Sequence, residues 1–138
     1  MKMRTLSFLS VLLLLSVANV AFSQTSATKT EANRTWPDFS RRFTAAINKK
    51  DHATLLRMMP KDFFDGGGGL TPSEWLQYLD KNERKGSWSS LRKSMAKGTM
   101  IDQKASKSGV ITRITKDDHY YFEFRKDRKW YFAGVVGD

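Results

Sequence analysis

The sequence predicts an α+β fold, in which three to four N-terminal helices pack on a curved, roughly four-stranded antiparallel sheet. Between residues 36 and 97, apolar residues recur at steps of three and four positions, which is typical of helices with one buried face. From residue 99 onward, short runs rich in Ile, Val, Thr and aromatic residues alternate with polar turns, which is typical of strands. The length of 138 residues suits one domain.

The N-terminus has the three-part pattern of a secretory signal peptide. Lys2 and Arg4 precede an apolar run over residues 6–17, and small residues follow at Ala21 and Ser23. The run is too short to span a bilayer comfortably, although an uncleaved anchor is the alternative. We therefore expect residues 1–23 to be a signal peptide that is cleaved before Gln24. The mature protein would be exported, periplasmic or secreted, and would have no membrane span.

The remainder divides into a leader and a folded unit. Residues 24–35 are polar without an apolar period and predict a flexible leader, and residues 36–138 predict the single α+β domain. The chain has no cysteine, so the fold has no disulfides to stabilise it. Loss of Lys2 and Arg4 on cleavage would lower the net charge from +10 to +8. Such charge favours an anionic partner, for example an anionic envelope component, or is simply a solvated basic surface. Export argues against nucleic acid.

Each predicted helix has a start or stop signal. Proline suits a first helical turn, so Trp36-Pro37 is expected to open the first helix. Asp51 can cap a short second helix that must stop near Pro60. Thr71 and Glu74 form a capping box for the third helix. The third helix should fade before Gly86, and a fourth helical segment, over residues 89–97, should end at Gly98. The apolar face of the first helix is expected to comprise Trp36, Phe39, Phe43, Ala46 and Ile47.

Four consecutive glycines precede the capping box: Gly66, Gly67, Gly68 and Gly69. Glycines before a helix start can cradle an anion with their amides. However, Pro72 removes one amide, Thr71 and Glu74 occupy others, and no lysine follows as it does in a phosphate-binding loop. The sequence therefore favours a flexible connection, which would act as a gating loop if it lies at the mouth of a ligand pocket.

The C-terminal third predicts a meander of four strands, over residues 99–104, 109–115, 119–125 and 129–136. In the last hairpin, a three-residue loop over residues 126–128 brings the bulky side chains of the two strands onto one face of the sheet. A two-residue loop would place them on opposite faces. We prefer the longer loop, which requires a positive φ at Arg128. The shared face would carry Tyr120, Phe122, Phe124, Trp130, Phe132 and Val136, and the outer face Tyr121, Glu123, Arg125, Lys129 and Tyr131.

The order of elements resembles the nuclear transport factor-like superfamily, which includes SnoaL-like and ketosteroid-isomerase-like domains with a cystatin-like cone. The residues that carry the resemblance are Phe39, Phe43, Ala46, Ile47, Asp51, Leu55 and Met58, and the terminal Asp127-Arg-Lys-Trp130. The resemblance implies a pocket between the helices and the concave face of the sheet, and often a homodimer. Its lining would include Trp75, Tyr78, Leu79, Tyr120, Phe122 and Trp130. The aromatic residues on the sheet would fill much of this space.

No residue is predicted firmly as catalytic. Enzymatic members of that superfamily place an Asp, Tyr or His in the cone, for which Asp102 with Tyr78 is the weak candidate here. His52 and His119 are expected in solvent. No hydrolase, metal or cofactor motif is present, so we expect no cofactor and no metal.

Function is predicted only as a class. The first hypothesis is a small basic domain that binds an unknown small ligand or partner without catalysis. The alternative is an isomerase-like or SnoaL-like enzyme that acts on a small hydrophobic substrate in the cone. The basic hairpin tip is a candidate anion site and comprises Arg125, Lys126, Arg128 and Lys129.

Overall fold

The structure is a computed structural model that describes residues 9–102 and 110–136, with side chains from Thr28 onward except that of Asp102. Within these ranges the chain has an α+β fold, with helices N-terminal to an antiparallel sheet of order β1-β2-β3-β4. The elements are α1 (Leu9–Lys49), α2 (His52–Arg57), α3 (Pro72–Lys81), the 3₁₀ turn η1 (Glu83–Lys85), α4 (Ser87–Lys97), β1 (Thr99–Asp102), β2 (Ile111–Thr115), β3 (Tyr120–Phe124) and β4 (Trp130–Val135). The predicted strand residues 103, 104 and 109 lie outside the described residues. None of the described helices is both long enough and apolar enough to cross a membrane.

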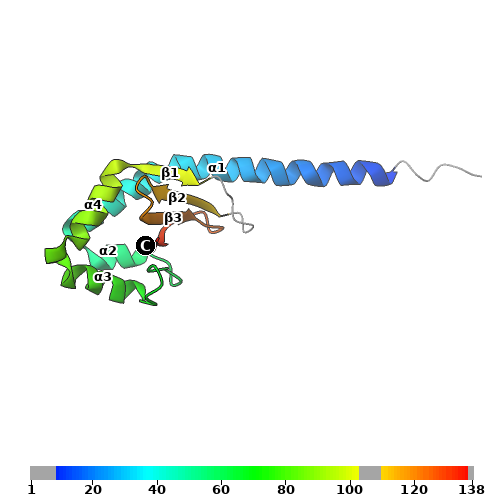
Figure 1. Cartoon of the computed structure of the whole chain (residues 1–138). Helices are drawn as coiled ribbons and strands as arrows, with labels where there is room; N and C mark the ends of the chain where they lie inside the picture. Colours follow the sequence, from blue (N-terminus) through cyan, green and yellow to red (C-terminus); the bar gives the residue numbers. More distant parts are fainter. Residues whose placement is uncertain (1–8, 103–109, 137–138) are drawn as a thin grey trace, which may run out of the picture.

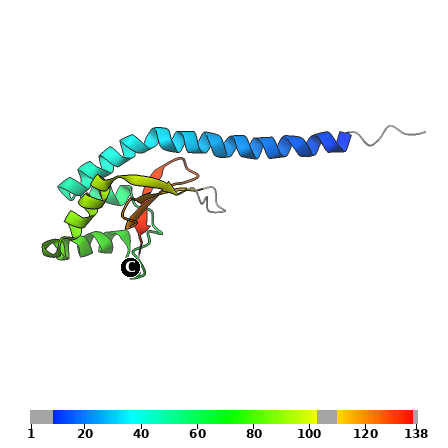
Figure 2. The ribbon, with the colours of Figure 1, turned by 45° about the horizontal axis from the view of Figure 1, so that its top comes forward.

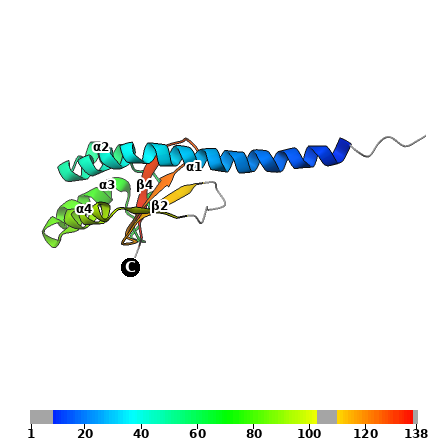
Figure 3. The same ribbon diagram turned by 90° about the horizontal axis from the view of Figure 1, so that it is seen from above.

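Figure 1 shows α1 running past the sheet, with α2, α3 and α4 gathered at one end of it. Seen from above in Figure 3, α3 and α4 lie on the same side of α1 as the sheet. The predicted helix signals are present: Asp51 caps α2 through the amide of Thr54, and Thr71 and Glu74 complete the capping box of α3. Gly98 ends α4 with a φ of 91°. Local signals therefore set the boundaries of these short helices.

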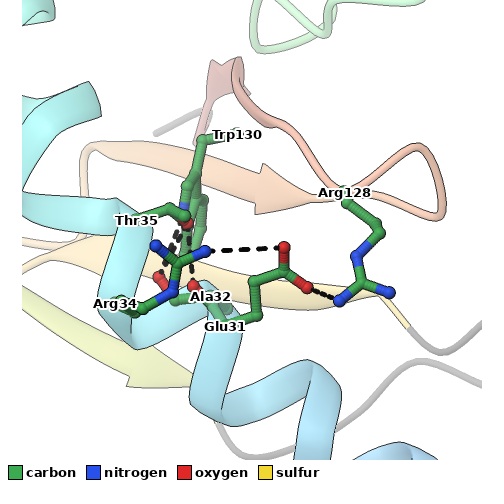
Figure 4. Close-up of polar contacts among 6 residues, drawn as sticks. All are labelled: Glu31, Ala32, Arg34, Thr35, Arg128 and Trp130. Carbon is green, nitrogen blue, oxygen red and sulfur yellow. Dashed lines mark hydrogen bonds and ion pairs between the residues drawn. The ribbon is translucent and has the colours of Figure 1, made fainter.

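The expectation of a flexible leader over residues 24–35 is wrong, because α1 runs through it and the body of the fold contacts its second half. Ala32 is fully buried, and its carbonyl accepts a hydrogen bond of 3.0 Å from Trp130 Nε1. Glu31 forms ion pairs with Arg34 and Arg128, as Figure 4 shows. The partners of this segment lie about 100 positions further along the chain, where no local pattern reveals them.

Pro37 does not open the first helix but lies inside α1. A proline within a helix lacks the amide that would bond to the carbonyl four residues earlier, and it usually bends the helix. The hydroxyl of Thr35 also donates to the carbonyl of Glu31, at 2.9 Å, and such bonds bend helices further. Figure 2 shows that α1 changes direction between its blue and cyan parts. The bend lets one helix both cover the sheet and reach α4.

A buried cation joins β2 to the same part of α1. Arg113 is only 7% exposed and donates to Asn33 Oδ1 at 2.8 Å. Its guanidinium lies over the rings of Trp36 and Trp130, 4.6 and 5.2 Å from their centroids. Arginine stacks well on aromatic faces because its charge is spread over a plane. Burial lowers the pKa of Arg113, but arginine remains charged at neutral pH.

Aromatic rings fill the space between the helices and the sheet. The ring of Phe122 lies 5.3 Å from those of Phe43 and Phe132, and edge-to-face contacts link it to Trp36 and Phe39. Such arrangements add to the stabilisation from burial. The fully or almost fully buried rings are Phe39, Phe43, Phe63, Trp75, Trp88, Phe122, Phe124, Trp130 and Phe132. The interior of the predicted cone is therefore a packed core.

The last hairpin has the predicted three-residue loop. Arg125 N donates to Lys129 O at 3.0 Å, and Arg128 has a φ of 62°. Phe124 pairs with Trp130 on the buried face, as expected. One detail is wrong: Val136 is 41% exposed instead of buried. A second irregularity, between Tyr121 and Phe122, shifts the pairing so that Val135 lies opposite Tyr120.

The free edge of β4 is covered by the segment before the glycines. Phe64 pairs with Gly134 in parallel, with backbone bonds of 3.1 Å to Ala133 O and 2.8 Å from Val135 N. A β-carbon on Gly134 would lie 2.5 Å from the Phe64 carbonyl oxygen and 2.7 Å from the Tyr121 ring. Glycine is required there because the two chains approach so closely. At Ala133 and Val135 the backbone groups of this edge are therefore already paired.

We predict that the second half of the leader stabilises the fold. A chain that begins at Trp36 loses Ala32 O and Asn33 Oδ1, the hydrogen-bond acceptors of Trp130 Nε1 and of Arg113. Each buried polar group left without a partner lowers the free energy of unfolding by about 1 to 3 kcal/mol. The urea midpoint of the shortened chain should therefore lie well below that of a chain that begins at Gln24. The double variant Glu31→Gln/Arg34→Gln, which removes only ion pairs with exposed partners, should change stability little. Equal midpoints for the two chain lengths would show that the leader contributes nothing.

Candidate functional site

A pocket of about 490 Å³ lies between α3, α4, the turn that joins β2 to β3, and the end of β4. This volume falls within the range of about 300 to 1000 Å³ that is usual for small-molecule sites. The pocket's lining comes from α3, α4, the turn between β2 and β3 and the ends of β3 and β4, and includes no residue of α1. The lining residues are Trp75, Tyr78, Leu79, Ser87, Ser90, Lys93, Ser94, Lys97, Asp117, His119, Tyr120 and Val135.

The predicted pocket lining is therefore divided between two places. Trp75, Tyr78, Leu79 and Tyr120 line the side pocket. Phe122 and Trp130 do not, because both are buried against α1 in the core. The four glycines proposed as a gating loop are also absent from its lining.

One face of α4 supplies the polar side of the pocket. Ser87, Ser90, Lys93, Ser94 and Lys97 follow one another at helical steps, so they lie on one side of the helix. Trp88 and Leu91 lie on the other side and are buried in the core. The serine and lysine face of this helix was not predicted from the sequence. Its signal was the spacing of serines and lysines on the face opposite to the apolar residues.

Asp117, in the turn after β2, is the acidic residue of the pocket lining. Its Oδ2 accepts 2.7 Å from Ser94 Oγ and 3.3 Å from Lys97 Nζ, and its side chain is 14% exposed. Burial opposes ionisation of this carboxyl, but the bonds from Ser94, Thr115 and Lys97 together outweigh it and hold the pKa of Asp117 well below its usual range. Asp117 is therefore a fixed anion at neutral pH.

The opposite wall carries a phenol that remains protonated. Burial, the charge of Asp117 and the proximity of Tyr78 raise the pKa of Tyr120 to about 12. The backbone amide of Tyr120 donates to Thr115 Oγ1 at 3.1 Å, which fixes the start of β3 beside the turn. Tyr120 therefore offers a hydroxyl donor at neutral pH. Tyr78 is 51% exposed at the rim.

The arrangement of Ser94, Asp117 and His119 is not that of a nucleophilic triad. In such a triad the histidine lies between the serine and the acid and accepts the serine proton. Here the hydroxyl of Ser94 donates directly to Asp117, and His119 Nδ1 lies 3.5 Å from the other carboxylate oxygen. Among the described residues, no group of three His, Cys, Asp or Glu side chains could hold a metal ion.

The two weak catalytic candidates are not brought together by the described contacts. Asp102 ends β1 opposite Thr112, and its side chain lies outside the described residues. Tyr78 lies on α3 at the pocket rim. His52, on α2, lies with Nε2 3.0 Å from Asp80, whose other oxygen accepts from Trp88 Nε1 at 3.0 Å. Asp80 therefore helps hold both α2 and α4 to α3, and His52 is its partner on α2.

Two of the four cations at the hairpin tip are paired with acids. Arg125 donates to Glu123 at 2.8 Å and to Asp62 at 2.9 Å, and Arg128 pairs with Glu31. Lys126 and Lys129 have no ion pair among the described residues. The two arginines therefore stabilise contacts within the fold, and the hairpin tip has fewer unpaired cations than its composition suggests.

The glycine loop, residues 66–69, does cradle an anion, and that anion is its own Asp65. The Asp65 carboxylate accepts from the amides of Gly67 at 3.2 Å, Gly69 at 2.9 Å and Leu70 at 2.7 Å. The bond from Leu70 contributes most to lowering the pKa of Asp65. A β-carbon on Gly68 would lie 2.8 Å from Asp65 Oδ2. The amides that an external anion would need are thus occupied.

Comparison of the chain with protein-family models, curated proteins and solved structures finds no match. The resemblance to the nuclear transport factor-like superfamily therefore stays a prediction from the sequence.

We predict that Asp65 holds the glycine loop in place. Asp65→Ala leaves three amides without their acceptor, so hydrogen exchange at Gly67, Gly69 and Leu70 should quicken at least tenfold, while exchange in the core strands stays unchanged. Gly68→Ala should have the same effect, since its methyl group displaces the carboxylate. Unchanged exchange at these amides in both variants would refute this role.

We predict that Asp117 stabilises the fold at neutral pH and loses this effect in acid. The folded pKa lies below the unfolded value of about 3.9, so the stabilisation is complete above that value and disappears as pH falls through the folded pKa. Asp117→Asn should therefore lower the urea midpoint at pH 7, and the difference from wild type should shrink as pH falls below about 4. The neighbouring Asp118→Asn is the control. A pH-independent difference would contradict the mechanism.

Proposed function

We propose that the chain is a non-enzymatic binding module that takes a small anionic ligand into the pocket between α3 and α4. The observation that carries this proposal is the polar face of α4, which places Lys93 and Lys97 beside three serines within a pocket of about 490 Å³. Asp117 offsets only one of the two lysine charges. The site therefore favours an anion.

The opposite side of the pocket is suited to an apolar body. Trp75 and Leu79 are buried at its base, and the rings of Tyr78 and Tyr120 face the same space as Val135. Ligand sites commonly combine an apolar wall with a few polar groups that orient the ligand. The ligand expected here has an anionic group and a compact body that contacts the aromatic wall.

Binding is favoured over catalysis by the state of the ionisable groups. Proton abstraction requires a base whose pKa lies near the working pH. Asp117 is held strongly ionised and already accepts hydrogen bonds from Ser94 and Lys97, so it is a weak base. The cone interior, where an isomerase-like enzyme would bind its substrate, is filled by rings such as Phe122 and Phe132.

The proposal extends to the compartment. The N-terminal sequence pattern supports export, and the net positive charge suits a surrounding rich in anionic polymers. The ligand would then be a component or product of the cell envelope, or a solute of the periplasm or medium.

We predict saturable binding of cyclohexanecarboxylate, which has one carboxylate on an apolar ring. In an NMR titration of the chain that begins at Gln24, the amide shifts should be confined to α4, the end of α3 and the turn after β2. Lys93→Met/Lys97→Met should weaken binding about tenfold, which corresponds to about 1.4 kcal/mol.

The matched control is Lys126→Met/Lys129→Met, which removes the same charge at the hairpin tip. This variant should bind as wild type does. If both double variants weaken binding equally, the attraction is due to net charge and the pocket is not the site. If the shifts are at the tip, the anion site predicted from the sequence replaces the pocket.

A further inference from the structure

Tyr120 is almost entirely buried, yet its hydroxyl has no partner in the described part of the chain. The residue is 8% exposed, and its backbone amide donates to Thr115 Oγ1. No described residue forms a hydrogen bond with its phenol oxygen. Buried tyrosine hydroxyls usually have a partner, because an unmet polar group is costly to bury. This hydroxyl is therefore unusual within the fold.

The hydroxyl lies at the pocket. Tyr120 lines the pocket, and so do Asp117 and Tyr78, the two side chains whose proximity helps to raise the pKa of this phenol. Among the described residues, Arg113 Nε and Asp117 Oδ1 are the fully buried side-chain atoms without a partner, and the Tyr120 oxygen is not one of them. The oxygen therefore keeps some exposed surface. Because the rest of the residue is buried, that surface faces the pocket that Tyr120 lines.

A neutral acceptor suits this hydroxyl better than an anion does. The hydroxyl remains protonated at neutral pH, because burial raises the pKa of Tyr120 to about 12, so it can donate a hydrogen bond. The negative charge of Asp117 also contributes to this shift. The charge that disfavours a phenolate also disfavours a ligand carboxylate beside it, whereas a neutral oxygen is affected little.

The carboxylate of the ligand is expected elsewhere in the pocket. Lys93 has no ion pair in the described part of the chain, and it lies about one helical turn before Lys97 on α4. Trp75, Leu79 and Val135 line the same pocket with apolar surface. The pocket thus offers a cation, a hydroxyl donor and an apolar wall to one small molecule.

We propose that the ligand is a small acid that carries a neutral acceptor oxygen, ether or carbonyl, on its apolar body, and that the Tyr120 hydroxyl donates to that oxygen. This inference rests on the proposed function, because it assumes that the pocket binds an anion. It adds a second polar contact, which selects among acids of similar size and charge.

Three acids built on one six-membered ring test this contact. Cyclohexanecarboxylate has no acceptor besides its carboxylate, tetrahydropyran-4-carboxylate has an ether oxygen in place of one methylene group, and 4-oxocyclohexanecarboxylate has a ketone there. In an NMR titration of the chain that begins at Gln24, at least one oxygenated acid should bind about fivefold more tightly than cyclohexanecarboxylate, which is the effect of one hydrogen bond. The tighter of the two identifies the oxygen as ether or carbonyl.

Tyr120→Phe tests the donor, because it removes the hydroxyl and keeps the ring. The preference for the oxygenated acid should disappear in this variant. Tyr131→Phe is the matched control and should keep the preference, because the Tyr131 hydroxyl donates to Asp127 and the residue is not part of the pocket lining. Without ligand, the urea midpoint of Tyr120→Phe should not fall, since the lost hydroxyl has no partner in the described part of the chain.

The outcomes separate this inference from the proposed function. If the three acids bind equally to the wild-type chain, the acceptor oxygen is wrong and the anion pocket stands. If Tyr120→Phe weakens all three acids equally, the hydroxyl binds the carboxylate and the neutral acceptor is wrong. A lower urea midpoint for Tyr120→Phe would show that the hydroxyl stabilises the fold, which also overturns the inference. If none of the three acids binds, the proposed function itself is overturned.

Discussion

Trp130 forms the junction on which the arrangement of the other elements depends. It begins β4, donates from Nε1 to the carbonyl of Ala32 in α1, and lies 4.8 Å from the ring of Trp36. The guanidinium of Arg113 lies over both of these rings, 4.6 Å from the centroid of Trp36 and 5.2 Å from that of Trp130. One indole thus joins the last strand, the longest helix and the buried cation of β2. Because its polar atom and its aromatic faces are all used, the helix can occupy only one position on the sheet.

That position determines where the pocket lies. With α1 held against the sheet, Phe39 and Phe43 contact Phe122 and Phe132, so that aromatic rings fill the space between this helix and the sheet. The α3–α4 pair is anchored differently, through Asp80, which contacts both Trp88 and His52. This pair covers the sheet at its end and not along its middle. A pocket therefore forms where α4 meets the turn after β2, and that turn places Asp117 against Ser94.

Much of the fold follows from patterns that are local in the sequence. The capping box at Thr71 and Glu74, the stop at Gly98 and the positive φ at Arg128 are each set within a few residues, and all three predictions are confirmed. The prediction of a flexible leader is wrong because the partners of this segment, Trp130 and Arg113, are distant in the sequence. A polar segment with one buried alanine also shows no periodic pattern of apolar residues. The contacts of the glycine loop were not predicted for another reason. The anion that its amides hold is the neighbouring side chain of Asp65, whereas glycines before a helix start usually point to an external anion.

Pairing of charged groups within the protein, as for Asp65, also explains why amino-acid composition predicts the anion site poorly. Arg113 stacks on tryptophans, and Arg125 and Arg128 are neutralised by Asp62, Glu123 and Glu31, so several cations that contribute to the net charge are committed to the fold. Such pairs have most of their effect on geometry, since exposed ion pairs add little stability. The cations that remain available to a ligand are those with few acidic residues nearby, or with an acidic partner that already accepts another hydrogen bond. On α4, Lys97 shares Asp117 with Ser94, and Lys93 has no ion pair in the described part of the chain. A cation that could bind a ligand thus differs from one that stabilises the fold, because it is not fully paired with acidic side chains of the protein.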